Sequence, residues 1–222
     1  MNPQAEAMLR TIEDHVAATA HETGCATLSG PLRHALLSVP RDRFVPAAQR
    51  HHAWEDAPLP IGHGQTISQP FIVALMSALV EPQPGSRLLE VGCGCGYQAA
   101  VLAAAGARVF GVEIVEPLAR RAAATLSELG YGEVTIRAGD GYGGWPEQAP
   151  FDGILVTAAG ADVPDPLRQQ LRVGGRMVLP VESPSGLQEL LLVTRESDQV
   201  FRSRSVLAVR FVPLTRGVAA AD

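Results

Sequence analysis

From Ser68 onward, short apolar runs alternate with alanine-rich segments that carry a helical period. Strands that alternate with helices at this spacing predict βαβ units, and therefore a parallel sheet with right-handed crossovers. Two later apolar runs have no helix between them and predict an antiparallel hairpin at the edge of that sheet. The predicted strands are Arg87–Gly92, Arg108–Glu113, Val134–Ala138, Gly153–Ala158 and Arg176–Val181, the helices between them Tyr97–Ala105, Pro117–Leu129 and Asp165–Leu171, and the hairpin strands Gln188–Thr194 and Val206–Pro213.

The N-terminal third has a different pattern. Residues 3 to about 38 predict two short helices, with Gly30 and Pro31 as the break between them. Residues 40–70 are rich in Pro, Gly and His and show no periodicity. A loop of that length is usually either functional or disordered. We expect an ordered loop that lies over a site, because it contains the apolar residues Trp54, Ile61 and Ile67.

Ser68 and Gln69 precede Pro70, which suits the start of a helix whose apolar face runs to Val80. The whole pattern predicts an α/β fold: a Rossmann-like, doubly wound, mostly parallel sheet with an N-terminal helical cap and a C-terminal antiparallel hairpin. A chain of 222 residues allows one large domain or two small ones. We expect one domain over residues 1–222.

Composition narrows the possible chemistry. Hydrophobic residues make up 46% of the chain and charged residues 18%, which allows a sizeable core. The chain contains arginine but no lysine, and this excludes a P-loop phosphate lysine or a Schiff-base lysine. The net charge of -5 disfavours a sequence-independent grip on nucleic acid. All 6 histidines precede residue 64, so a triad in the order Ser, Asp, His cannot form.

The expected location is cytoplasmic, without contact with a membrane. Three cysteines form no even disulfide framework, which fits a reducing compartment. The N-terminus carries acidic residues and no long apolar region, unlike a signal peptide. The longest apolar stretch, Phe71–Val80, is about half of what a bilayer requires.

The clearest local motif is the segment Leu88–Tyr97, in which a buried strand runs into three alternating glycines and then a helix. Glycine lets the backbone turn tightly and approach a ligand closely. A dinucleotide fingerprint has the spacing G-x-G-x-x-G, with the pyrophosphate at the helix N-terminus. Here the third glycine, Gly96, arrives one residue early. The spacing therefore favours a nucleoside ligand without a pyrophosphate over a nicotinamide dinucleotide.

Acidic residues stand at the ends of three consecutive predicted strands. Glu113 is placed to accept hydrogen bonds from ribose hydroxyls, as the acid after the second strand does in nucleotide-binding sheets. Asp140 could accept from an adenine amino group, although it is also an ordinary turn former between two glycines. Glu90 could hold a ligand ammonium group. Together these acids suit S-adenosylmethionine, a cationic nucleoside. Cys93 and Cys95 have no further Cys or His downstream to complete a tetrahedral set, so we expect no metal site.

The segment Leu59–Pro70, followed by the glycine motif, closely resembles the protein-L-isoaspartate (D-aspartate) O-methyltransferase family. The block Gly64–Pro70 carries most of the specificity, because Rossmann-like methyltransferases of other families lack it. The resemblance covers about residues 30 to 214 in the family order. Three further stretches look like the same family: Arg41–Pro46, Phe151–Ala159 and Val209–Leu214.

This resemblance implies a class I S-adenosylmethionine-dependent methyltransferase that methylates L-isoaspartyl and D-aspartyl residues of damaged proteins, with S-adenosylhomocysteine as the product. It divides the chain into a helical cap with a substrate loop (1–70), a cofactor-binding core (71–185) and a C-terminal hairpin with a tail (186–222). Ser68 matches the family's active-site serine. The family usually has Thr or Ser where this chain has Cys93 and Cys95, and we expect the weaker thiol donors to loosen cofactor binding modestly. The expected cofactor contacts are Thr66, Ile67, Ser68, Glu90, Gly92, Cys93, Gly94, Gly96, Glu113, Ile114, Asp140 and Gly141, and the expected substrate contacts are Ile61, Gln65, Thr66, Ile67, Ser68, Val209, Arg210, Phe211 and Val212.

Several of these residues also have a simpler interpretation. Ser68 could be the N-cap of the helix that begins at Pro70. Arg210 alternates with apolar neighbours and could face solvent, or it could contact an acidic peptide. Arg41 and Arg43 are expected to cap or pair locally, and His63 to be a loop residue.

Three other functions compete with repair of isoaspartyl proteins. A related enzyme could methylate a normal aspartate in a dedicated peptide, although such relatives often carry added C-terminal segments. A protein that only senses S-adenosylmethionine would not need the substrate block Thr66–Ser68. A nicotinamide dehydrogenase is disfavoured by the glycine spacing. We expect a protein that acts as a monomer on isoaspartyl proteins or peptides.

Overall fold

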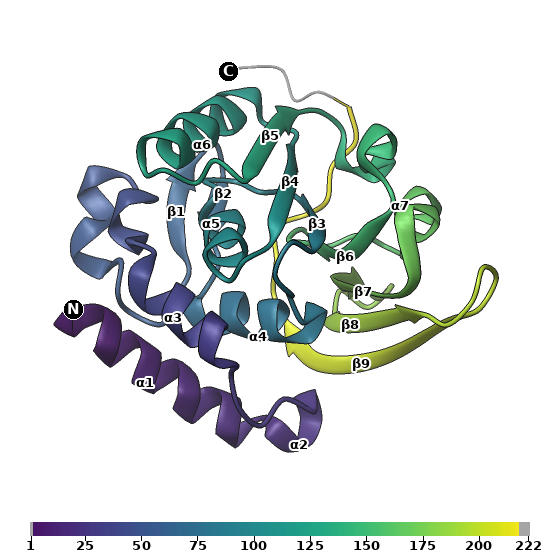
Figure 1. The fold of residues 1–222 in the computed structure, drawn as a ribbon, viewed down its shortest axis with the longest axis horizontal. Coiled ribbons are helices and arrows are strands. Elements are labelled where there is room, and N and C mark those ends of the chain that lie inside the picture. The colour runs from purple at the N-terminus through teal and green to yellow at the C-terminus, as the bar shows by residue number, and fades with distance from the viewer. Residues whose placement is uncertain (1, 218–222) are drawn as a thin grey trace.

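A computed structural model describes residues 2–217 of the chain (Figure 1). Seven strands form one sheet in the order β5-β4-β3-β6-β7-β8-β9. The strands from β5 to β7 are parallel, and β8 and β9 are antiparallel to their neighbours. The predicted α/β fold with a C-terminal antiparallel hairpin is therefore confirmed. The strands are β3 (Arg87–Val91), β4 (Arg108–Glu113), β5 (Val134–Ala138), β6 (Phe151–Val156), β7 (Leu171–Glu182), β8 (Gln188–Arg195) and β9 (Phe201–Val209).

Successive side chains of each strand point to opposite faces of the sheet, and both faces are buried. Leu88 packs into the core on one face and Leu89 into the core on the other. The first face is covered by α4 (Pro70–Val80), α5 (Tyr97–Ala104) and α6 (Glu116–Glu128). The second is covered by α7 (Asp165–Gln170) and by Trp145 from the segment after β5. Burial on both faces explains why the strands have near-continuous apolar sequences.

The order of the strands reverses beside β3. From β3 the chain first builds outward through β4 and β5, and it then returns to place β6 on the other side of β3. In an open α/β sheet such a switch point leaves a crevice at the carboxyl ends of the strands, where ligands bind. Gly92 follows β3 and Thr157 follows β6, so both lie at this point.

The N-terminal region forms three helices, and the predicted break at Gly30 and Pro31 is wrong. Gly30 begins α3 (Gly30–Ser38), and the Ser29 side chain accepts a hydrogen bond from the backbone N–H of Leu32. The break lies earlier, after α1 (Pro3–Ala18) and the short α2 (Ala20–Thr23), which ends at Gly24 with φ of 71°. Proline suits the first turn of a helix because its missing N–H is not needed there.

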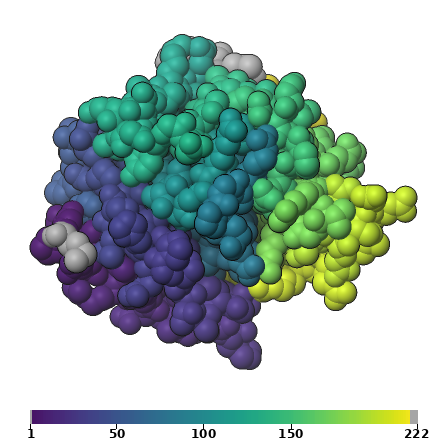
Figure 2. All heavy atoms as spheres, in the orientation of Figure 1, coloured from purple at the N-terminus to yellow at the C-terminus, as the bar shows by residue number. Residues whose placement is uncertain are grey.

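These helices share one hydrophobic cluster with the sheet. Figure 2 shows the N-terminal residues (purple) packed against the central part of the chain (teal). The helix α2 also contacts β9, where Arg204 donates to the carbonyl of Thr23. Among residues 2–217, no helix has the length and apolar character that crossing a bilayer requires.

The segment 40–70 is ordered, but it is more regular than its sequence predicts. It contains two 3-10 helices, Arg41–Arg43 and Ala47–His52, and a hairpin of β1 (Leu59–Gly62) and β2 (Gln65–Ile67). The turn of the hairpin places Gly62, His63 and Gly64 at positive φ. Two glycines make such a turn possible. The two strands are too short to show an alternating pattern, so the sequence alone does not predict them.

The C-terminal hairpin begins at Gln188 as predicted, but its second strand begins and ends earlier than predicted. β9 spans Phe201–Val209, whereas the prediction was Val206–Pro213. The consecutive polar residues Arg202–Ser205 near its start are exposed on an edge strand, where charged side chains are common. After Val209 the chain leaves the sheet and pairs with Ala159 through a bridge at Pro213. The predicted tail beyond Gly217 lies outside the described residues.

Candidate active site

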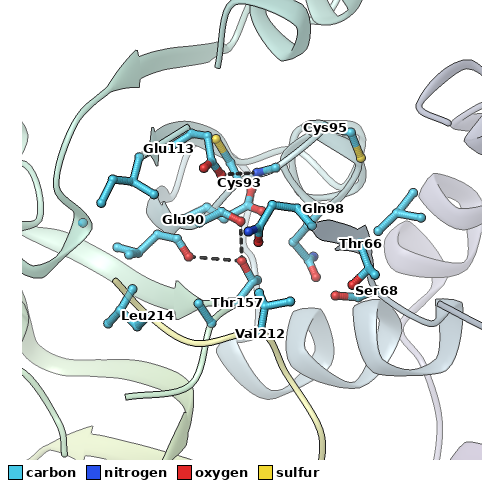
Figure 3. A pocket seen from close by; sticks show the side chains of 18 of the residues that line it. Thr66, Ser68, Glu90, Cys93, Cys95, Gln98, Glu113, Thr157, Val212 and Leu214 are labelled. Carbon is cyan, nitrogen blue, oxygen red and sulfur yellow. Dashed lines mark hydrogen bonds between the residues drawn. The ribbon is translucent and has the colours of Figure 1, made fainter. Parts of the chain in front are cut away.

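A cavity opens at the switch point between β3 and β6 (Figure 3). It contains about 760 Å³ of space free of protein atoms, part of it open to solvent. Of the predicted cofactor and substrate contacts, those that line it are Gln65, Thr66, Ile67, Ser68, Glu90, Gly92, Cys93, Gly94, Glu113, Ile114, Gly141 and Val212.

The glycine loop after β3 forms one wall of this cavity. Gly92 and Gly94 have φ of 83° and 53°, which residues other than glycine rarely adopt. A Cβ on Gly92 would lie 3.1 Å from Thr157 Oγ1, and one on Gly94 would lie 3.3 Å from Ile61 Cδ1. Any other residue would therefore crowd the cavity wall. Cys93 and Cys95 are buried beside it as free thiols, and burial raises the pKa of Cys95 to about 11.

Two buried glutamates face the cavity, and they differ in their hydrogen bonding (Figure 3). The Glu113 carboxylate accepts hydrogen bonds from the backbone N–H groups of Gly94 at 2.7 Å and Val115 at 2.9 Å. Burial raises the pKa of Glu113, and these hydrogen bonds oppose that shift. Glu90 Oε2 is buried without a hydrogen-bond partner within residues 2–217. Burial, with the nearby charge of Glu113, raises the pKa of Glu90 well above its usual range.

Three predicted contacts, Asp140, Gly96 and Ile61, line neither this cavity nor the groove beside it. Asp140 instead accepts a hydrogen bond from the backbone N–H of Tyr142 at 2.9 Å and lines a neighbouring cleft. Gly96 starts α5, and a Cβ there would meet Leu126 of α6 at 3.0 Å, so its role is helix packing. Ile61 is fully buried and packs toward Gly94 from the hairpin.

A groove with an apolar wall adjoins the cavity. The predicted substrate residues Val209, Arg210, Phe211 and Val212 line it together. Thr66, Ser68, Thr157 and Val212 line both the groove and the cavity. These four residues therefore mark the place where a ligand in the cavity and a chain in the groove would meet.

Ser68 does not cap α4. The N-cap residue is Gln69, and its side chain forms no capping hydrogen bond. The cap comes from Asp56 instead, whose Oδ1 accepts from the backbone N–H of Phe71 at 2.8 Å. Asp56 Oδ2 also contacts Gln69 and His15. The interpretation of Ser68 as an N-cap is therefore wrong, because a distant carboxylate occupies that role and leaves the serine hydroxyl for the site.

We expect Asp56→Ala to lower the free energy of unfolding by about 1–2 kcal/mol, the range of a lost helix cap with its charge-assisted bonds. Asp56→Asn keeps one acceptor oxygen and is expected to lose less. Urea denaturation measures both. Asp14→Ala, at an exposed acid on α1, is the matched control and should change stability by less than about 0.5 kcal/mol. Equal stability of the two alanine variants would contradict the capping role.

Sequence reasoning missed several residues that line the site. Thr157 donates from its hydroxyl to the carbonyl of Gly92 at 2.6 Å and so fixes the start of the glycine loop. Its position directly after a parallel strand at the switch point is a signal that could have found it. Gln98 lines the cavity and donates to Ser77 Oγ at 2.7 Å. His15 lines the groove from α1, and no local signal connects it to residues so far along the chain.

The cavity fits S-adenosylmethionine in its chemistry. The unpartnered Glu90 oxygen suits the ammonium group, and the Glu113 carboxylate suits the ribose hydroxyls. The glycine loop leaves open the space that a Cβ would fill. Within residues 2–217, no group of three or more His, Cys, Asp or Glu side chains is arranged to hold a metal ion.

An open, mostly parallel sheet with a glycine-rich, acidic cavity at its switch point and an adjoining groove is the arrangement expected of a Rossmann-like S-adenosylmethionine-dependent methyltransferase. The family model for protein-L-isoaspartate(D-aspartate) O-methyltransferase matches residues 15–219. The chain belongs to this family, and the predicted family membership is confirmed.

Relatives and solved structures agree with this assignment. Protein-L-isoaspartate O-methyltransferase 2 of Syntrophobacter fumaroxidans is 50% identical over 95% of this chain and 85% of that protein. The Opitutus terrae protein-L-isoaspartate O-methyltransferase is 56% identical over 82% of this chain and 78% of its own length. A solved protein-L-isoaspartate O-methyltransferase superposes with a TM-score of 0.85 at 29% identity, over 96% of this chain and 67% of that one. A Plasmodium falciparum structure in complex with S-adenosyl-L-homocysteine shares the fold, with a TM-score of 0.79 at 22% identity over 98% of this chain and all of that one.

Proposed function

We propose that this chain transfers the methyl group of S-adenosylmethionine to the carboxylate of L-isoaspartyl residues in damaged proteins. The observation that carries the proposal is the junction of the cavity and the groove at Ser68. Methyl transfer between two substrates needs two sites that open onto each other, and this junction supplies that arrangement.

The reaction asks little acid–base chemistry of the protein. A carboxylate with a pKa of about 4 is ionised at neutral pH, so no general base is needed. S-adenosylmethionine, when bound, supplies a methyl group activated by a positive sulfonium. The protein must hold the carboxylate oxygen in line with that methyl group, and such alignment can supply about 7–11 kcal/mol. The absence of lysine, and of histidine beyond residue 63, is therefore no obstacle.

Each wall of the site has a proposed role. The Ser68 hydroxyl orients the substrate carboxylate by donating a hydrogen bond. Glu113 and the glycine loop hold the nucleoside, and Glu90 holds the ammonium group. Val209, Phe211 and Val212 contact the peptide chain in the groove, where Arg210 is also placed. Asp140 keeps its predicted contact with adenine only if the ligand reaches the neighbouring cleft that Asp140 lines.

The proposed partners are isoaspartyl proteins or peptides, and nucleic acid is not among them. The net charge of -5 supports the second part. The proposal also includes a monomer in the cytoplasm and a single domain over the chain. The hydrophobic cluster shared by the N-terminal helices and the sheet supports a single domain.

Two matched peptides test the function, one with isoaspartate and one with aspartate at the same position. We expect S-adenosylmethionine and the protein to add a methyl ester to the isoaspartyl peptide alone, followed by decay to the succinimide, as read by mass spectrometry. The normal aspartyl carboxylate lies one methylene away from the required position, so its turnover should be negligible. Comparable turnover of both peptides would contradict the proposed specificity. Activity on neither, with the cofactor still bound, would favour a dedicated peptide substrate or a sensor.

A further inference from the structure

Arg41 is a fully buried arginine at the start of the segment 40–70. Its Nε donates to the carbonyl of Ala53 at 2.9 Å. Its Nη2 donates to the carbonyl of Ala57 at 3.3 Å and to that of Ser68 at 2.8 Å. One side chain thus connects three points of the segment between residues 53 and 68. The last of the three is the backbone of Ser68, whose side chain stands at the junction of the cavity and the groove.

This arrangement differs from the local pairing that the sequence predicts. Arg43, two residues later, does not pair locally either, because its partner at the protein surface is Glu128 of α6. Arg41 takes part in none of the ion pairs formed within residues 2–217. Its Nη1 is buried without a hydrogen-bond partner among these residues, and burial lowers the pKa of its guanidinium. Burying a cation without a direct ion pair is costly, so stability alone is a poor explanation for its presence.

Arg41 also contacts the cofactor side of the site. Its guanidinium carbon lies 4.8 Å from the centre of the Tyr97 ring. Tyr97 is buried, lines the cavity and is the first residue of α5 after the glycine loop. A guanidinium over an aromatic face is an attractive contact that strengthens when water is excluded. Arg41 therefore joins the backbone of Ser68 to the helix that begins where the glycine loop ends.

We infer that Arg41 is a positioning residue for methyl transfer, which sets the backbone of Ser68 relative to the glycine loop. The inference rests on the role of Ser68 proposed above. A planar guanidinium holds several acceptors in fixed directions, which a lysine ammonium on a flexible stem does not. A small displacement of Ser68 would leave Glu90, Glu113 and the glycine loop in place but would misalign the carboxylate, and misalignment of about 1 Å can cost about a hundredfold in rate.

The test uses Arg41→Lys and Arg41→Met in the full chain, each assayed well below its melting temperature. We expect kcat for the isoaspartyl peptide to fall about tenfold in both, while the Kd for S-adenosylhomocysteine stays within about threefold. Arg43→Ala, from the same 3-10 helix, is the control for a lost surface arginine and should keep its kcat. Leu36→Ala is the control for a weakened core, since Leu36 is buried and lines neither the cavity nor the groove.

A double-mutant cycle separates positioning from general support. If Arg41 acts through Ser68, Arg41→Lys should lower kcat by less than about threefold once Ser68→Ala is present, whereas Leu36→Ala should act equally in both backgrounds. The inference would be overturned if the effects of Arg41→Lys and Ser68→Ala on kcat were additive, or if either Arg41 variant alone kept an unchanged kcat. The loss of cooperative melting in both Arg41 variants would also overturn it, because Arg41 would then support the whole fold. Unchanged kcat in Ser68→Ala alone would overturn the proposed role of Ser68 first, which distinguishes the two failures.

Discussion

Ser68→Ala should lower kcat for the isoaspartyl peptide by about a hundredfold, the order of loss for a misaligned reactant. The hydroxyl stands where the cavity and the groove meet, and it is not engaged as a helix cap. Its loss should leave the carboxylate free to rotate away from the line of attack. The Kd for S-adenosylhomocysteine and the free energy of unfolding should change little, because Asp56 caps α4.

The measurement combines steady-state kinetics with calorimetric titration of S-adenosylhomocysteine. Ser38→Ala is the matched control, since this serine in α3 donates to the carbonyl of Ala35 and lines neither cavity nor groove. A large loss of cofactor affinity in Ser68→Ala would mean that the serine supports the cavity itself. A kcat equal to that of Ser38→Ala would remove it from the reaction.

Glu90→Gln should weaken the affinity for S-adenosylhomocysteine by about 10- to 100-fold, which corresponds to about 1.5–3 kcal/mol for a hydrogen bond to a charged group. The glutamate is buried with an unpartnered oxygen at the cavity, where the cofactor's ammonium group would provide the missing charge. Glutamine keeps the shape and removes the charge, so the change isolates the electrostatic contribution.

The same carboxyl group should make ligand binding depend on pH. Burial raises the pKa of Glu90 well above its usual range. At pH values between the ordinary glutamate pKa and this raised pKa, the folded, ligand-free protein therefore retains a proton that the unfolded chain has released. Its contribution to stability is therefore fully present below the ordinary glutamate pKa and is lost as pH rises through the raised pKa. Ionised Glu90 binds an ammonium group, so affinity should rise with pH across that range.

Calorimetry at a series of pH values tests both statements, with urea denaturation of the ligand-free protein alongside. Glu90→Gln should flatten the dependence of affinity and of stability on pH. Glu133→Gln, at an exposed acid next to β5, is the control and should change neither. Unchanged affinity in Glu90→Gln would show that the carboxylate does not face the ammonium group, and an unchanged pH profile would show that another residue titrates.

Local pattern determined much of this protein. The alternation of apolar strands and alanine-rich helices predicts the parallel sheet, because a strand buried on both faces must be apolar throughout. The spacing of Gly92 and Gly94 predicts a close approach of backbone to ligand, and both glycines do have positive φ at the cavity wall. Glu113 at the end of its strand reaches the same cavity. These features depend on residues that are neighbours in the chain, so they can be predicted from the sequence.

The tertiary structure decided the roles of residues whose partners are distant in the chain. Ser68 looks like a helix cap in sequence, but the fold brings Asp56 to that position. The sequence predicts that Arg41 caps or pairs locally, but the fold buries it and directs its guanidinium to the carbonyl of Ser68. Thr157 reaches Gly92 only because β6 pairs with β3. The acceptor of a hydrogen bond to a backbone carbonyl cannot be predicted from residue type, since every residue offers the same acceptor. The sequence by itself therefore determined the sheet and the glycine loop. Only the tertiary structure decided how the segment 40–70 is held against the sheet and the glycine loop.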